Sequence, residues 1–240
     1  MRMSSPYLVP TVAGAAILAA GAAVGGAFIG KGVENAQVGD RSVTVRGLSE
    51  REVKADLAVL ALKFAAAGDD LAAVQADVDG DLAATRRFLA QRGFATSEVE
   101  LGRFEVTDQF AREYQSSNVQ ARYRVAQTVI VRTPNVDRVQ QTSRALDGLV
   151  RQGVVLQDYN GPSYIFTKLN SVRGPMIAEA TASARTGAQQ FARDSGSNLG
   201  GISRASQGSF EILGRDEVGD ESSQVFKKVR VVTTVTYRLK

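Results

Sequence analysis

The 240-residue sequence contains no cysteine, no histidine and no tryptophan. Without cysteine the chain can form no disulfide framework and has no thiol nucleophile. Without histidine it can form no Ser-His-Asp triad, and no thiolate or imidazole is available to bind a metal ion. Any catalysis would therefore have to depend on Asp, Glu, Lys, Tyr, Ser or Thr.

Proline is scarce, with 5 residues, and there is no long run of Lys or Arg. Hydrophobic residues make up 44% of the chain and charged residues 22%, which is typical of a folded protein rather than a disordered one. The formal net charge is +4, from 29 basic and 25 acidic residues that are interspersed. Since nucleic-acid-binding proteins usually cluster their positive charge, we expect no nucleic-acid partner.

The N-terminal segment lacks charged side chains over 28 residues, from Met3 to Gly30. About 20 apolar residues are enough to cross a bilayer as a helix. We therefore predict one transmembrane helix over residues 1–31, which acts as a membrane anchor. The apolar side chains expected in the lipid are Tyr7, Leu8, Val12, Ile17, Leu18, Val24, Phe28 and Ile29.

A cleaved signal peptide is the alternative for the same segment. Such a peptide has a shorter apolar region, followed by a small-x-small cleavage site before polar sequence begins. Here the apolar run continues to Ile29 and Lys31 follows almost directly, which favours the anchor. Arg2 lies on the short side of the segment and favours a cytoplasmic N-terminus. The rest of the chain would then lie outside the cytoplasm.

Three motifs resemble functional sites but have simpler interpretations. The segment Gly25–Lys31 matches the start of a P-loop, yet Gly32 stands where a Ser or Thr should bind magnesium. The segment Asp77–Asp81 resembles part of a calcium loop, but its glycine is misplaced and a helical apolar stripe continues through it. Asp69 and Asp70 precede that helix, and we interpret them as capping residues.

Residues 32–41 are predicted as a linker and residues 42–240 as one extracytoplasmic domain. Alternating apolar runs predict strands at 42–47, 56–64, 99–106, 119–132, 154–158, 164–169, 202–213 and 224–239. Amphipathic runs predict helices at 71–92, 136–150 and 176–195. Since each long helix is followed by a hairpin-like pair of strands, we predict an α+β fold, mainly antiparallel sheet with helices packed on one face.

Several side chains of these elements are assigned to the core. In the second helix they are Val136, Val139, Leu146 and Val150. In the last helix, Pro175 is expected at the first helical position, and the inward residues are Ile177, Ala180, Ala184, Ala188 and Phe191. In the final strand they are Val229, Val231, Val235, Tyr237 and Leu239, with Lys228 and Arg230 on the opposite face.

The segment Val43–Gly47, followed by Glu50, Val53 and Asp56, resembles the opening motif of the SIMPL-domain family. Further matches follow in the family's order: the strand that begins at Ala121, the Ala-rich helix from Ala178 to Ala192, the turn Leu199–Ile202 and the closing strand from Val229. The resemblance covers roughly residues 42–240. It implies an α+β fold, a location in the bacterial envelope and no agreed enzymatic activity.

The motif residues themselves suggest structural roles. Gly47 suits a bulge or a positive φ between strands. Glu50 and Asp56 are expected to bond local backbone amides where two strands connect.

The function that we expect is that of a non-enzymatic, membrane-anchored envelope protein whose SIMPL-like domain associates with itself. Long strands with open edges can extend a sheet between copies. Members of the family include proteins linked to oxidative-stress defence and one that assembles into channel-like rings. The resemblance therefore implies a scaffolding or stress-protection role, or a ring. We expect a homo-oligomer in the bacterial inner membrane, with its bulk in the periplasm, and allow for an unidentified envelope partner.

Two other classes of function stay open. The first is a binding module for a small molecule, peptide or lipid headgroup, with the candidate partner surface Phe110, Tyr114, Tyr159, Tyr164 and Phe166. The second is a hydrolase, but Ser195-Gly196-Ser197 ends a helix and lacks the strand–turn–helix context of a nucleophile. We therefore predict no catalytic residue, no cofactor and no metal ligand.

Overall fold

The computed structural model describes residues 21, 25–26, 41–111 and 120–240. No helix within these residues combines the length and the hydropathy that a membrane crossing requires. Tyr114 lies outside the described residues, and so do all the residues assigned to the lipid: Tyr7, Leu8, Val12, Ile17, Leu18, Val24, Phe28 and Ile29.

The chain has an α+β fold and divides into two compact units. Among the described residues, unit 1 comprises 21, 25–26, 41–48, 178–208 and 232–240, and unit 2 comprises 49–111, 120–177 and 209–231. The predicted antiparallel sheet is in fact two sheets. One has the strand order β1-β9-β7, with β8 also paired to β9, and the other has the order β3-β4-β2-β5, with β6 also paired to β2.

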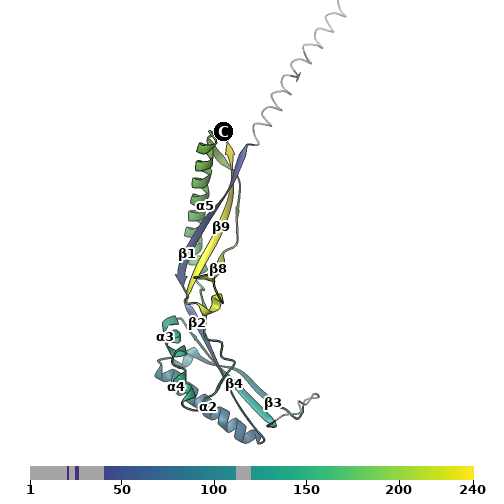
Figure 1. Cartoon of the computed structure of the whole chain (residues 1–240), viewed down its shortest axis with the longest axis vertical. Helices are drawn as coiled ribbons and strands as arrows, with labels where there is room; N and C mark the ends of the chain where they lie inside the picture. Colours follow the sequence, from purple (N-terminus) through teal and green to yellow (C-terminus); the bar gives the residue numbers. More distant parts are fainter. Residues whose placement is uncertain (1–20, 22–24, 27–40, 112–119) are drawn as a thin grey trace, which may run out of the picture. The chain divides into compact units, whose positions relative to one another are not determined.

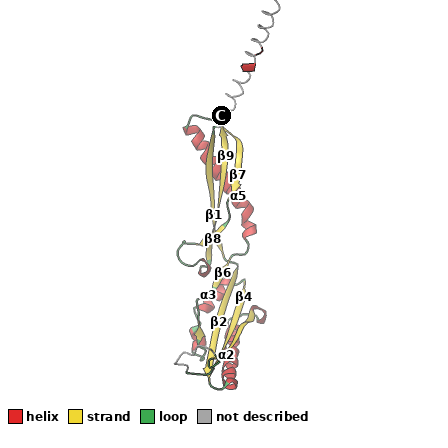
Figure 2. Cartoon of the chain, turned by 90° about the vertical axis from the view of Figure 1, so that its right-hand side faces the viewer, coloured by secondary structure: helices red, strands yellow, loops and turns green. Residues whose placement is uncertain are grey.

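The first sheet is built from the strands at the two ends of the described chain. They are β1 (Ser42–Lys54), β7 (Leu199–Gln207), β8 (Glu211–Gly214) and β9 (Phe226–Leu239). Figure 2 shows β1, β9 and β7 side by side. The odd-numbered side chains of β9 are buried from Val229 to Tyr237, as the alternation predicted, although Leu239 is only partly buried. The predicted strand 202–213 is two strands, since β7 ends before Gly208.

Helix α5 (Leu169–Asp194) packs on this sheet in unit 1. Its buried residues recur every four positions: Met176, Ala180, Ala184, Ala188 and Ala192. This spacing is the i±4 ridge by which helices pack, so Ala192 takes the place predicted for Phe191, which is 51% exposed. Pro175 lies inside the helix and not at its first position. The turn before it is helical although proline cannot donate to the Ser171 carbonyl.

Gly47 does not have the positive φ that the sequence suggested. A Cβ built on Gly47 would lie 1.8 Å from the Ala180 carbonyl oxygen and 2.5 Å from the Ala184 amide nitrogen. Glycine is therefore needed here because the backbone of α5 passes directly against β1. The small core of unit 1 forms around this contact, from Val43, Ala184, Ala188, Val235 and Tyr237.

The second sheet, in unit 2, carries the larger core. Its strands are β2 (Leu57–Gly68), β3 (Val99–Asp108), β4 (Tyr123–Thr133), β5 (Leu156–Gln157) and β6 (Ser163–Ile165). Helix α2 (Leu71–Gln91) packs on β2 and β4 (Figure 1). It begins where Asp70 accepts hydrogen bonds from two amides of the first turn and ends before Gly93, whose φ is +84°. The predicted capping is confirmed for Asp70, whereas the Asp69 carboxylate accepts from the Arg122 amide at 3.0 Å instead.

The predicted helix 136–150 is broken in two: α3 (Val136–Ser143) and α4 (Asp147–Val150). Between them the amides bond three residues back, as in Gly148 to Ala145 and Leu149 to Leu146. Such turns hold about three residues instead of 3.6. The buried side chain is therefore Leu149 and not Val150, which was predicted in the core and is 53% exposed. Short 3-10 turns lie at Thr96–Glu98 and Glu221–Ser223. The predicted strands 154–158 and 164–169 shrink to β5 and β6, and α5 begins at Leu169.

Candidate functional site

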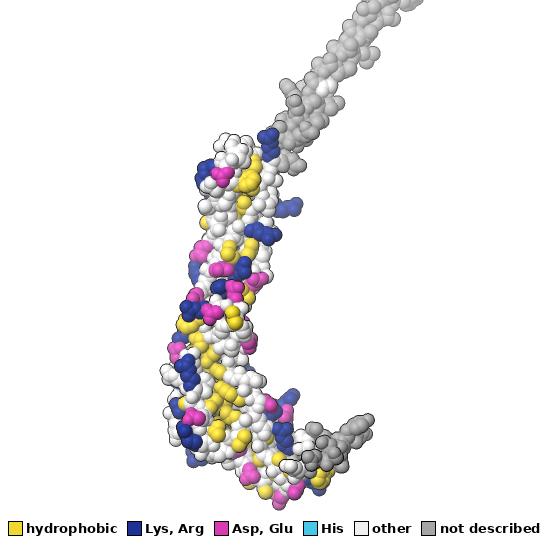
Figure 3. All heavy atoms as spheres, viewed as in Figure 1, with side chains coloured by type: hydrophobic (Ala, Val, Ile, Leu, Met, Phe, Trp, Pro, Cys, Tyr) yellow, Lys and Arg dark blue, Asp and Glu magenta, His cyan; other side chains and the backbone are white. Residues whose placement is uncertain are grey.

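Charges of both signs lie close together on the face shown in Figure 3, and no patch of one sign dominates it. Several exposed carboxylates pair with a nearby base, such as Asp137 with Lys54 and Glu217 with Lys228. Within the part of the chain that the structure describes, no cluster of three or more acidic residues could hold a metal ion.

The aromatic residues of the predicted partner surface that the structure describes do not form one surface. Phe110 follows β3 and is 51% exposed, whereas Tyr164 on β6 is 4% exposed and belongs to the core. Tyr164 pairs with Ala58, near the start of β2. Asp108, the last residue of β3 before Phe110, pairs with Tyr123 of β4, and Tyr123 pairs with Gly68 at the end of β2. Ten residues of strand separate these positions, or about 34 Å. They therefore lie at opposite ends of the sheet.

Tyr164 instead supports the fold together with Tyr159. Burial raises the pKa of both phenols, and both hydroxyls hydrogen-bond to Ser143 at the end of α3. Phe166, two residues further along the chain, is partly buried. This end of the candidate surface is therefore largely a packing arrangement between β6 and α3.

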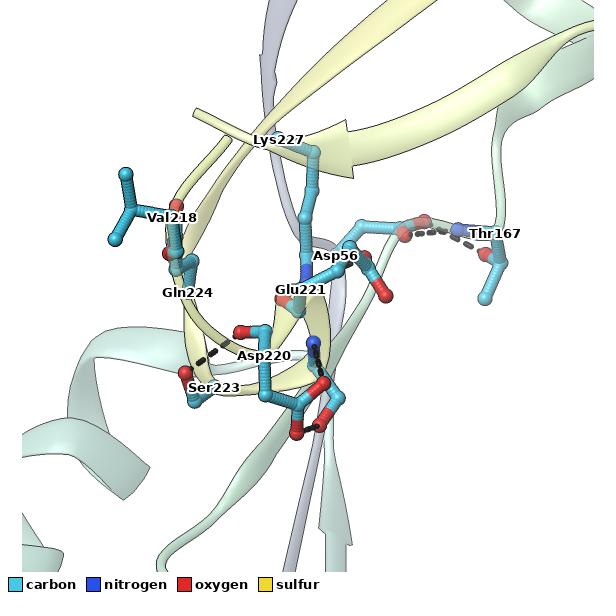
Figure 4. A network of polar contacts seen from close by, with 9 residues as sticks. Asp56, Thr167, Val218, Asp220, Glu221, Ser223, Gln224 and Lys227 are labelled. Carbon is cyan, nitrogen blue, oxygen red and sulfur yellow. Dashed lines mark hydrogen bonds and ion pairs between the residues drawn. The ribbon is translucent and has the colours of Figure 1, made fainter. Parts of the chain in front are cut away.

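A polar network surrounds Lys227, at the start of β9 (Figure 4). The side chain of Lys227 is fully buried, and its ammonium lies 2.6 Å from the Glu221 carboxylate and also donates to the Glu221 carbonyl oxygen. Asp220 caps this turn by accepting from the Ser222 amide at 3.1 Å and the Ser222 hydroxyl at 2.6 Å. A buried lysine can act as a base or nucleophile, but here the ammonium is already held by two acceptors. Its contacts indicate a structural role.

Asp56, also drawn in Figure 4, joins two distant parts of unit 2. Its carboxylate accepts from the Thr167 amide at 2.6 Å and the Thr167 hydroxyl at 2.8 Å. Burial opposes the charged form, but these hydrogen bonds outweigh it, so the pKa of Asp56 lies below its ordinary value. The expected partners were local amides, and the partner is 111 residues away. The carboxylate of Glu50 lies 3.5 Å from Arg230 Nε.

The edge strand β3 carries an apolar row that was not expected from its sequence. Each of its residues continues a cross-strand row of the core: Leu101 beside Val129 and Leu62, Phe104 beside Gln127 and Phe64, and Val106 beside Val125 and Ala66. Leu101, Phe104 and Val106 are nevertheless 52%, 49% and 51% exposed, because α2 packs on β2 and β4. The core face of this sheet thus includes β3, which α2 leaves largely uncovered.

A β-bulge keeps this row on one face. The register shifts between Leu101 and Phe104, so one extra residue stands in β3. The side-chain amide of Gln127 donates to the carbonyl oxygens of Gly102 and Arg103, at 3.4 Å each. A Cβ built on Gly102 would lie 2.9 Å from Ile130 Cδ1. The sequence carries a sign of this bulge. The apolar residues stand at odd positions up to Leu101 and at even positions from Phe104, whereas a strand without a bulge would keep them all odd or all even.

A cleft of about 350 Å³ opens where α2 ends beside the start of β3. Its lining comprises Arg86, Arg87, Ala90, Phe94, Thr96 and Val99. Arg86 and Arg87 are exposed, and neither forms an ion pair with any residue that the structure describes. The cleft therefore combines an apolar floor with two cationic side chains at its rim.

The first sheet, which contains β1, β9 and β7, also ends in an edge strand. In the order β1-β9-β7, strand β1 pairs with β9 alone among the described strands. The Arg41 carbonyl accepts from the Leu239 amide, and the hydroxyls of Thr44 and Thr236 lie 2.9 Å apart. From the first pair to the second, β1 advances by as many residues as β9 goes back, so the two strands run antiparallel. No bulge lies between these two pairs. By contrast, the register of β7 on β9 shifts twice.

Comparison with known families identifies this architecture. The model of the SIMPL family, described as a protein of unknown function (DUF541), matches residues 43–237. The match spans most of the chain and begins and ends within the two long strands β1 and β9. No curated protein matches the sequence.

Proposed function

Since this chain belongs to the SIMPL family, we propose that it is a non-enzymatic envelope protein whose SIMPL domain associates with further copies of itself. In this proposal the N-terminal apolar segment anchors the chain in the bacterial inner membrane, and the domain lies in the periplasm. The assembly acts as a scaffold or protects the envelope under stress. The support for association comes from the sheet edge formed by β1.

The edge of β1 offers backbone groups for pairing. In an antiparallel pair, residues alternate between pairs that exchange two hydrogen bonds and pairs that exchange none. Arg41 exchanges a bond with Leu239, so even-numbered residues direct their N–H and C=O away from β9. The close hydroxyls of Thr44 and Thr236 agree with a non-hydrogen-bonded pair. By the same alternation, the backbone of Arg46 faces the open edge, where another strand can add.

The symmetry of the contact decides the size of the assembly. If β1 pairs with β1 of a second copy, the interface uses the same surface twice and closes as a dimer. If β1 pairs with β7 of the next copy, the contact is head-to-tail and produces a ring or a filament. The bulges of β7 make it the poorer partner, because bulged edges resist pairing. We therefore propose the dimer as the basic unit.

Two variants at one position test this proposal. Arg46→Pro removes one outward N–H from the β1 edge, whereas Arg46→Ala removes the charge and keeps that N–H. Light scattering of the full chain in detergent should give an oligomer for the wild type and for Arg46→Ala, and a monomer for Arg46→Pro. Circular dichroism should show the same fold in all three. A monomeric wild type, or an oligomer unaffected by Arg46→Pro, would contradict the proposed edge.

A further inference from the structure

We propose that the groove between α2 and the edge strand β3 binds an extended segment of another protein, which adds to β3 as a further strand and presents an acidic group to Arg86 and Arg87. This site lies wholly within unit 2 and is distinct from the β1 edge. Its occupant follows from three features: an open backbone edge, an apolar floor and two cationic side chains at the rim.

Among the strands that the structure describes, β3 pairs with β4 alone. The strand stands at the end of the order β3-β4-β2-β5. Beyond the bulge, the Gln109 amide donates to the Arg122 carbonyl at 2.7 Å, so odd-numbered residues bond toward β4. The N–H groups of Phe104 and Val106 therefore point to the open edge. A peptide in strand conformation can bond to them in the manner of β-augmentation.

The side chains beside that edge favour a peptide with alternating apolar residues. Leu101, Phe104 and Val106 share the face toward α2, and each is about half exposed. Natural edge strands usually protect such a face with charge or by covering it, since an exposed apolar edge promotes aggregation. Every second side chain of an added strand would cover this row. The opposite face of β3 is already paired, with Glu105 near Lys63 and Glu100 near Arg132.

Charge complementarity decides what the segment carries at one end. Arg86 and Arg87 lie at the cleft beside Val99, the first residue of β3. The acid that precedes Val99 in sequence has other partners: Glu98 accepts from the Ala95 amide at 2.8 Å and lies 3.7 Å from Arg138. An arginine pair over an apolar floor favours a carboxylate, from an Asp or Glu side chain or from a chain terminus. An acidic, alternating segment therefore fits better than a basic one.

The experiment uses the full chain in detergent and a synthetic labelled peptide of about eight residues, which matches the length of the β3 row. In the peptide, valine alternates with threonine and the last two residues are aspartates. A control peptide replaces both aspartates by lysines. Fluorescence polarisation should show binding of the acidic peptide, with affinity for the lysine peptide weaker by about tenfold or more.

Matched variants separate the three features. Val106→Pro removes an outward N–H, and Val106→Ala trims the side chain but keeps that N–H, so Val106→Pro should bind more weakly by about tenfold than Val106→Ala. The double variant Arg86→Glu with Arg87→Glu should reverse the preference and favour the lysine peptide. Equal melting curves would show that these variants are folded.

Each contrary result has a definite meaning. No binding of the acidic peptide by the wild type would overturn the proposal. Binding that is unchanged in Val106→Pro would show that side chains, and not the backbone of β3, hold the peptide, and would also overturn it. Loss of self-association in Val106→Pro, with Arg46→Pro unaffected, would make β3 the contact between copies instead. If the wild type is monomeric but binds the acidic peptide through β3, the proposed function fails and the peptide proposal stands.

Discussion

Replacing Gly47 by alanine should destabilise unit 1 strongly, although the change adds only one methyl group. The added Cβ would lie 1.8 Å from the Ala180 carbonyl oxygen, where contacts closer than 3.0 Å are essentially never found. The obstacle is backbone, so no side-chain rotation can relieve it. The helix α5 would have to move away from β1 by more than 1 Å, which opens the small core of Val43, Ala184, Ala188, Val235 and Tyr237.

The magnitude follows from overpacking. Extra methylene groups in a packed core usually cost about 1–3 kcal/mol, and a clash with backbone lies at or above the top of that range, so we expect about 3 kcal/mol for Gly47→Ala. For a chain of this size, that loss lowers the melting temperature by about 6–12 °C. Differential scanning calorimetry of the full chain in detergent measures it directly.

A matched glycine on the same helix gives the control. Gly187 lies in α5 and is exposed, and no atom lies within 4 Å of the position that a Cβ would take there. Gly187→Ala should therefore be neutral or raise the stability by about 0.5–1 kcal/mol, because alanine favours a helix interior. If Gly47→Ala melts within about 2 °C of the wild type, below the shift expected for 1 kcal/mol, then close approach does not explain the glycine.

Two further predictions concern the polar contacts of unit 2. Asp56→Asn should cost about 1–2 kcal/mol at pH 7, because it weakens two charge-assisted hydrogen bonds from Thr167. The pKa of Asp56 is lowered by folding, so its contribution is complete above the unfolded value of 3.8 and is lost as the pH falls through the lower folded pKa. Denaturant titrations of both proteins should therefore converge as the pH falls below 3.8 and through the folded pKa, and a constant difference would refute the assignment. Glu221→Ala should cost about 3 kcal/mol because it leaves the buried Lys227 ammonium without its carboxylate, whereas Lys227→Met should stay within about 1 kcal/mol of the wild type. The opposite order in urea denaturation would show that the ion pair itself stabilises the fold.

Local signals were predicted well where the cause lies within a few residues. Helix α2 begins at the Asp70 cap and ends before Gly93, as its sequence indicates, because capping bonds and a positive φ are properties of the nearby backbone. The buried odd face of β9 was also predicted from its alternation. The same alternation did not reveal that Lys227 lies on that buried face, because burial of a charge depends on the Glu221 turn that covers it.

The candidate site was less accessible to sequence reasoning. The aromatic residues Phe110 and Tyr164 were grouped by residue type, but the register of β2, β4 and β6 places them at opposite ends of a sheet. For β3, the alternation predicted only that residues 99–106 form a strand. Its exposure depends on where α2 packs, and no pattern within β3 records that.

The sequence by itself determined the fold class, the SIMPL family and the course of its longest elements, since periodicity, caps and motif order are written along the chain. Only the tertiary structure decided that there are two sheets, that Gly47 is needed for the approach of α5, and that β1 and β3 are edges. These features depend on which distant strands pair and which faces the helices cover. They arise from contacts between segments that lie far apart along the chain, and such contacts leave little trace in local sequence.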